Sequence, residues 1–101
     1  MNIQIRGIGI PPTEALEAHI ERRLAFSLSR FSAYLERVVV RFSDLNGPRG
    51  GQDKLCQVNF TLRGLPPEVV EARDADLYYA VDQAAEKAGR RAARMLERTR
   101  N

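Results

Sequence analysis

The sequence predicts an α+β fold with the element order β-α-β-β-β-α. Four short segments alternate polar and apolar residues, as strands do, and two longer segments repeat apolar residues at helical spacing. Each predicted helix has one apolar stripe, and each predicted strand has one apolar face. The economical arrangement is a four-stranded sheet with two helices packed on one face. A chain of 101 residues suits a single domain, which we expect to span 1–101.

The N-terminal third of the chain predicts a strand followed by a helix. Residues 2–5 alternate in polarity, and the Pro-Pro pair at 11–12 ends the extended segment. Thr13 occupies an N-cap position, and the acidic residues that follow it suit the helix dipole. We therefore expect a helix over 13–30. Its buried stripe consists of Leu16, Ile20, Leu24, Leu28 and Phe31.

Three further strands are predicted over 38–43, 56–63 and 68–73. The alternation over 56–63 is the clearest in the chain, which indicates one buried face and one solvated face. Between the first two of these strands, the residues 46–51 are rich in glycine and predict a mobile hairpin loop.

The final helix, predicted over 75–98 with Asp74 as its cap, separates its charges onto two flanks. On a wheel of ~100° per residue, its apolar stripe consists of Leu77, Val81, Ala84, Ala88, Ala92 and Met95. The cations of one flank are Lys87, Arg90, Arg91, Arg94 and Arg98. The anions of the other flank are Asp82, Glu86 and Glu97. The first helix repeats the separation, with one flank of His19, Arg22, Arg23 and Arg30 and another of Glu14, Glu17 and Glu21.

This separation of charge favours a phosphate-binding surface over a merely solvated helix face. Solvated faces usually mix their signs, because opposite charges four residues apart support the helix. Here two like-charged pairs stand four apart, Lys87 with Arg91 and Arg94 with Arg98. Arginine outnumbers lysine, which suits bidentate phosphate contacts and base stacking. If the helices run parallel, only one of the two basic flanks can line the groove between them.

The sequence offers no catalytic, metal-binding or cofactor-binding set. His19 is the single histidine, and no nucleophile with an orienting partner accompanies it. Cys56 is the single cysteine and lies on the apolar face of a predicted strand, so we expect a buried, inert thiol. Tyr78 and Tyr79 are interpreted as packing residues. We expect no enzymatic activity, no cofactor, no metal and no small-molecule substrate.

The sequence also indicates a cytoplasmic protein with no membrane partner. No apolar run approaches the ~18 residues of a membrane span, and the first six residues lack the apolar stretch of a signal peptide. The net charge of +3 raises the expectation of a polyanionic partner without establishing one.

The chain resembles the ribosome hibernation-promoting factor family, also called ribosome-associated inhibitors or ribosomal subunit interface proteins. Its N-terminal part matches at Ile3, Ile5, Gly7, Thr13, Ala15, Leu16, Ile20, Glu21 and Leu24. Its C-terminal part matches at Asp76, Tyr78, Ala80, Val81, Asp82, Lys87, Arg90 and Arg94. The resemblance spans nearly the whole chain and depends on order, spacing and length together. It corresponds to a short, divergent member.

The resemblance implies binding to ribosomal RNA of the small ribosomal subunit, in the channel used by messenger and transfer RNA. Such binding would block translation during stress or starvation. Lys87, Arg90 and Arg94 carry over as RNA contacts, with Arg22 and Arg23 as further candidates. The alternative is a protein-interaction or regulatory module of the same fold without ribosome binding.

Overall fold

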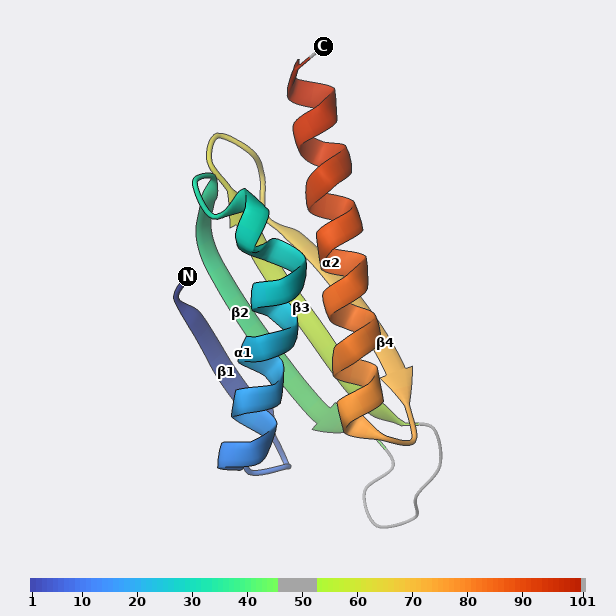
Figure 1. Cartoon of the computed structure of the whole chain (residues 1–101). Helices are drawn as coiled ribbons and strands as arrows, with labels where there is room; N and C mark the ends of the chain where they lie inside the picture. The colour runs from blue at the N-terminus through green and yellow to red at the C-terminus, as the bar shows by residue number, and fades with distance from the viewer. Residues whose placement is uncertain (46–52, 101) are drawn as a thin grey trace.

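The computed structural model describes residues 1–45 and 53–100, apart from the side chain of Arg100. The elements along the chain are β1 (Ile3–Ile8), α1 (Glu14–Leu28), a short 3₁₀ helix (Ser29–Phe31), β2 (Leu35–Asp44), β3 (Lys54–Leu62), β4 (Glu68–Asp74) and α2 (Leu77–Arg100). The four strands form one sheet in the order β1-β2-β3-β4 (Figure 1). The predicted fold class and element order are confirmed. The predicted loop over 46–51 lies outside the described residues.

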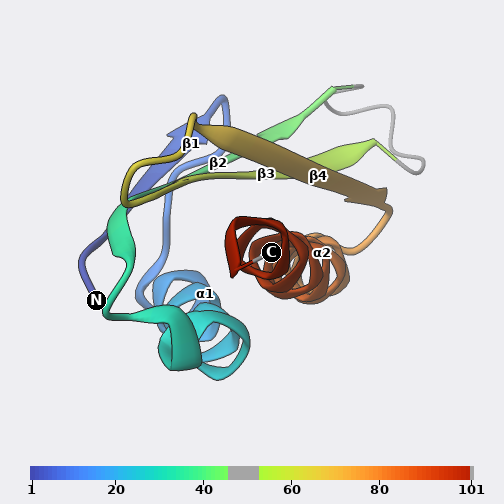
Figure 2. The same cartoon turned by 90° about the horizontal axis from the view of Figure 1, so that it is seen from above.

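The sheet is mixed, because its first two strands are parallel and the others are antiparallel. Ile3 pairs with Val38 in the parallel register of β1 and β2. β3 runs antiparallel to both of its neighbours. A parallel pair needs a crossover connection, which α1 provides. Both helices lie on the same side of the sheet (Figure 2), and both run in the same direction (Figure 1).

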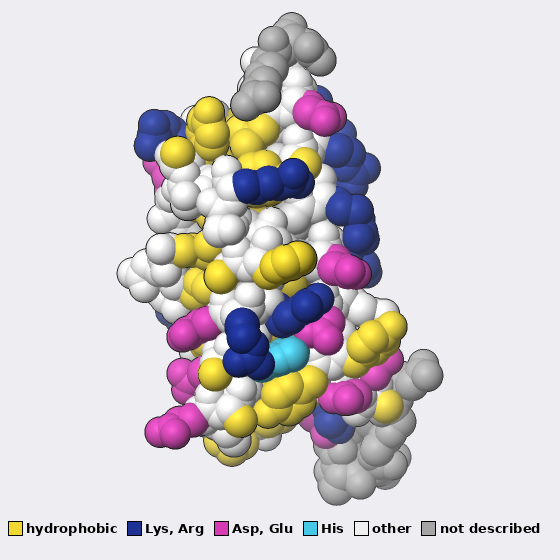
Figure 3. Space-filling view, in the orientation of Figure 1, with side chains coloured by type: hydrophobic (Ala, Val, Ile, Leu, Met, Phe, Trp, Pro, Cys, Tyr) yellow, Lys and Arg dark blue, Asp and Glu magenta, His cyan; other side chains and the backbone are white. Residues whose placement is uncertain are grey.

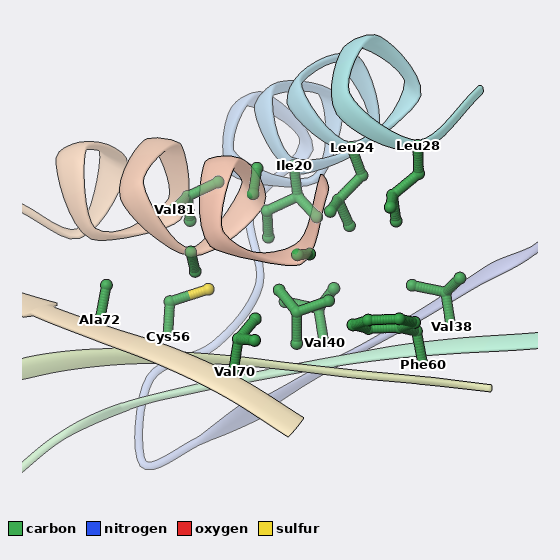
Figure 4. Packing of buried hydrophobic residues seen from close by; sticks show 14 of the residues in the cluster. Ile20, Leu24, Leu28, Val38, Val40, Cys56, Phe60, Val70, Ala72 and Val81 are labelled. Carbon is green, nitrogen blue, oxygen red and sulfur yellow. The ribbon is translucent and has the colours of Figure 1, made fainter. Parts of the chain in front are cut away.

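The core lies between the sheet and the two helices. β3 alternates as predicted, with Cys56, Val58, Phe60 and Leu62 all buried on the helix side. The α1 stripe predicted from the sequence is buried against the same face (Figure 4). Burial also raises the pKa of the Cys56 thiol to about 12, because an apolar environment disfavours the thiolate. The predicted buried cysteine is confirmed.

The ends of both helices differ slightly from the prediction. At the start of α1, the hydroxyl of Thr13 accepts a hydrogen bond of 3.1 Å from the Leu16 N–H, so the predicted cap is confirmed. The α-helix ends at Leu28, and residues 29–31 continue as a 3₁₀ helix. At the start of α2 the predicted cap was wrong. Asp76, not Asp74, accepts a hydrogen bond from the backbone N–H of Tyr78 at 2.9 Å.

Two glycines allow close approaches between segments of the chain. β1 extends to Ile8, beyond the predicted 2–5, because Gly7 has no side chain to interrupt it. A Cβ at Gly7 would lie 1.9 Å from the backbone oxygen of Ile10. Between the helices, a Cβ at Gly89 would lie 2.9 Å from the backbone oxygen of Ser27. The buried Gly89 therefore sets how closely α2 packs against α1.

Candidate nucleic-acid interface

The basic flank of α2 lies along the outer edge of β4. A hollow between the two elements is lined by Val69, Val70, Glu71, Lys87, Arg90, Arg91 and Arg94. Four of the five α2 cations predicted as a phosphate-binding surface therefore come together at one hollow. A line of Lys and Arg side chains along the right-hand edge of Figure 3 marks this side of the molecule.

Two of these cations have partners on β4. The Lys87 ammonium donates a 2.8 Å hydrogen bond to the backbone oxygen of Glu71, on the strand that forms the edge of the sheet. The Arg91 guanidinium forms an ion pair and a hydrogen bond with the Glu68 carboxylate. These contacts fasten α2 to the sheet edge. The Glu68 carboxylate also neutralises part of the charge that Arg91 offers to an outside partner, and Lys87 has one of its N–H donors occupied.

Three cations of the flank remain without such partners. Arg90, Arg94 and Arg98 are exposed, and within the described part of the chain none of them forms an ion pair. They stand four residues apart, which separates their Cα atoms by about 6 Å along the helix axis. We call these three residues the open arginine row. Three exposed guanidinium groups at this spacing can contact successive phosphates of one RNA strand.

Two residues of the basic flank of α1, His19 and Arg23, contact α2. The Asp82 carboxylate on α2 lies 2.7 Å from the His19 Nε2 and 3.1 Å from the Arg23 Nε. The second contact is an ion pair without hydrogen-bond geometry, so the buried Arg23 Nε has no hydrogen-bond acceptor. The His19 ring also meets the Tyr78 ring edge-on, with the ring centroids 5.0 Å apart. The anionic flank of α2 thus neutralises part of the cationic flank of α1.

A second hollow lies between the helices and contains the remainder of the α1 flank. Its lining residues are Arg23, Phe26, Ser27, Arg30, Ala85, Glu86, Gly89 and Arg90. The α1 flank therefore lines the groove between the parallel helices, while the α2 flank faces the sheet edge. Arg90 borders both hollows. Arg22 is exposed, with its Nη2 3.5 Å from the His19 Nδ1.

The predicted site residues therefore do not form one surface, and the sequence prediction missed two contributors. Glu68 neutralises Arg91, and no pattern in the sequence pairs these two positions. Phe26 lines the inter-helix hollow and is 83% exposed. A helical wheel could have found it, since Phe26 falls at about 280° from Leu16, among the α1 cations. Tyr79 is 52% exposed, so its interpretation as a packing residue was wrong.

The side chains that most often carry catalysis have internal contacts or are buried. His19 is held by Asp82 and Tyr78, and Cys56 is fully buried. Within residues 1–45 and 53–100, no three His, Cys, Asp or Glu side chains are grouped as metal ligands would be. The same described residues include no helix long and apolar enough to cross a membrane.

A family model described as "Sigma 54 modulation protein / S30EA ribosomal protein" matches residues 3–100. The match covers both helices and all four strands. The chain belongs to this family. The S30EA ribosomal protein family is ribosome-associated, and its members are modulation proteins rather than enzymes. The resemblance inferred from the sequence is confirmed.

Solved structures related to the S30EA family have the same fold. A ribosomal subunit interface protein from Coxiella burnetii aligns with a TM-score of 0.80 and 21% identity, over 96% of this chain and 99% of that one. The N-terminal domain of Protein Y from Thermus thermophilus aligns with a TM-score of 0.74 and 26% identity, over 94% of this chain and 99% of that one. The comparison with curated proteins gave no match.

Proposed function

We propose that this S30EA family member binds the small ribosomal subunit through its ribosomal RNA, in the channel used by messenger and transfer RNA. Bound there in the cytoplasm, it inhibits translation under stress or starvation. The family membership supports a ribosomal partner. The mechanism is occupancy, since a protein that fills the channel stops translation without any chemical step. The candidate RNA contacts are Arg90, Arg94, Arg98, Lys87 and Arg91 on α2, Arg22 and Arg23 on α1, and Arg30 in the 3₁₀ helix that follows α1.

The open arginine row is the observation that carries this proposal. Its three guanidinium groups are exposed and have no ion-pair partner within the described residues. Guanidinium groups bind phosphate oxygens bidentately and stay charged at any physiological pH. Each phosphate that they neutralise releases counterions, which provides most of the sequence-independent affinity for RNA. Lys87 and Arg91 contribute less, because both have partners on β4.

Co-sedimentation with purified small ribosomal subunits at rising salt tests the proposal. With about three phosphate contacts, the logarithm of the binding constant should fall with the logarithm of salt concentration at a slope of about −2 to −3. Added protein should also inhibit translation of a messenger in a reconstituted system, and excess messenger should relieve the inhibition. Absence of co-sedimentation at low salt would contradict the proposal.

The internal partners of the basic flanks favour a second candidate function. Arg23, Lys87 and Arg91 have partners within the domain, so part of the charge separation has a structural explanation. A protein-interaction or regulatory module without ribosome binding would need no RNA contact from the open arginine row. Under this alternative, binding to a partner protein would show a weak salt dependence, and ribosomal subunits would not co-sediment with the protein.

A further inference from the structure

Phe26 is the most exposed large hydrophobic side chain among the described residues, at 83%. It lies on α1, away from the buried stripe that packs on the sheet. Single exposed apolar side chains are common on protein surfaces, so the exposure alone indicates no function. What distinguishes Phe26 is its surroundings, because it borders a hollow whose other walls carry arginines.

The floor of this hollow consists of residues with little or no side chain. Gly89 and Ala85 of α2 and Ser27 of α1 line it. Gly89 brings the helices together, since a Cβ there would lie 2.9 Å from the backbone oxygen of Ser27. Small residues on the floor and larger ones on the walls leave a space of about 380 Å³ beside the Phe26 ring. Such a volume is within the range that small-molecule sites occupy.

Arginines from both helices surround this space. Arg30, four residues after Phe26 in the 3₁₀ helix that follows α1, lines the same hollow. Its guanidinium lies 4.6 Å from the centroid of the Phe31 ring, which orders the side chain and leaves the N–H donors at its edge accessible. Arg90 contributes from α2. On the face shown in Figure 3, Lys and Arg side chains lie among hydrophobic side chains.

We propose that the hollow between α1 and α2 binds one unpaired RNA nucleotide, with its base stacked on Phe26 and its phosphate held by Arg30 and Arg90. The inference rests on the proposed function and specifies that this part of the surface binds unpaired RNA. Base stacking on an aromatic ring tolerates any base, because every base has a π-face. Glu86 also lines the hollow, and a carboxylate accepts hydrogen bonds from the exocyclic amino groups of bases.

The charge around Phe26 favours a nucleotide over other ligands. A base within a duplex has both faces covered by its neighbours, so duplex RNA cannot use the Phe26 ring. An apolar protein segment would bring no charge for Arg30 and Arg90, which would then be desolvated without a partner. A nucleotide supplies a flat ring and an anion together. Arg90 also belongs to the open arginine row, so the bound nucleotide would be continuous with the RNA strand that this row contacts along α2.

Binding of an eight-nucleotide oligouridylate containing one 2-aminopurine tests the inference on the full chain, because uridines stack weakly and leave the free probe unstacked. Stacking quenches 2-aminopurine fluorescence, so the quench reports the contact with the ring itself. Phe26→Ala should weaken binding roughly tenfold and abolish the quench, whereas Phe26→Tyr should retain both. Tyr79→Ala removes an exposed aromatic side chain that does not line the hollow, and it should bind as the wild type does. Duplex RNA should bind equally to wild type and Phe26→Ala.

The outcomes separate this inference from the proposed function. Equal oligouridylate affinity and an equal quench for wild type and Phe26→Ala would overturn the inference, even if the wild type co-sediments with small subunits. Loss of co-sedimentation in Phe26→Ala without any change in oligouridylate binding would also overturn it, in favour of an apolar contact with a ribosomal protein. Failure of the wild type to co-sediment contradicts the proposed function instead, while the quench still decides whether Phe26 stacks on a base.

Discussion

The basic flanks of α1 and α2 have the same kind of charge but lie in different environments. On α1, His19 and Arg23 face α2 and share the Asp82 carboxylate. On α2, Arg91 contacts Glu68 of β4, while the open arginine row has no ion pair among the described residues. The α1 flank therefore holds the helices together along part of its length. The α2 flank is partly fastened to the sheet and otherwise available to a partner.

The difference follows from the parallel direction of the helices. Both basic flanks lie on the same rotational side of their helix, so the flank of α1 meets the acidic flank of α2. The flank of α2 meets the edge strand β4, where it contacts the Glu68 carboxylate and the backbone oxygen of Glu71. Separated charges on a helix can therefore serve internal contacts as well as an outside anion. Which role a given cation has depends on the element beside it.

The largest effect on the inter-helix side is expected from Gly89→Leu. The new side chain must occupy space where even a Cβ would lie 2.9 Å from the Ser27 backbone oxygen. Such overpacking should lower the free energy of unfolding by about 3 kcal/mol, as measured by urea denaturation. Ala18→Leu adds the same side chain at an exposed position of α1 and should change stability little. An unchanged midpoint for Gly89→Leu would contradict the close contact between the helices.

A smaller effect is expected from Asp82→Ala, which removes the shared anion. His19 loses a 2.7 Å contact, and the buried Arg23 Nε loses its counterion. The pair is partly exposed, so the free energy of unfolding should fall by only about 1 kcal/mol. Glu97→Ala removes an exposed acid from the same flank and should have almost no effect. Equal destabilisation by the two substitutions would show that the Asp82 contacts are not specific.

The fold was predictable because local patterns determine most of it. The alternation over β3 and the stripe of α1 correspond directly to buried residues, and Thr13 caps α1 as its position suggests. The start of α2 was less predictable, because Asp74 and Asp76 have the same chemistry and stand two residues apart. Only the backbone geometry decides that Asp76 accepts the Tyr78 N–H.

The candidate site was only partly predictable, since its charges depend on long-range contacts. A wheel places Arg91 and Arg94 on one flank, but it contains no information about β4. The Glu68 partner of Arg91 lies 23 residues away in the sequence. In the same way, the wheel places Asp82 on an acidic flank without showing that α1 lies beside it. Pairing between elements is a property of the tertiary structure.

Substitutions of Arg91 and Arg94 on α2 should have opposite consequences, since the first should lower stability and the second should weaken binding. Arg91→Ala removes the ion pair with Glu68 and should lower the free energy of unfolding by about 0.5 kcal/mol, with little change in RNA affinity. Arg94→Ala should leave stability unchanged and weaken binding to small subunits several-fold, and it should reduce the salt slope by about 1. Denaturation and binding curves of both variants give the comparison. Equal effects of the two substitutions on binding would contradict the division of the flank.

The smallest effect of these substitutions is expected on the rate of Cys56 alkylation, which measures whether the variants remain folded. Burial raises its pKa from 9.0 to about 12, so the native thiol should resist alkylation at pH 8. The raised pKa stabilises the fold below pH 9, and this contribution is lost as the pH rises toward 12. Arg91→Ala and Arg94→Ala should both leave labelling slow, as measured by mass spectrometry. Rapid labelling of the native wild type would contradict the position of Cys56 in the core.

The most direct test of the open arginine row compares two charge reversals of equal size. One variant changes Arg90, Arg94 and Arg98 to glutamate, and the other changes the exposed Arg6, Arg37 and Arg73 to glutamate. Both change the net charge by the same amount, and Cys56 labelling verifies that both remain folded. We predict that the first variant loses co-sedimentation with small ribosomal subunits at near-physiological salt, while the second retains most of it. Equal loss in both variants would show that net charge alone governs binding, and retained binding in the first would contradict the role of the row.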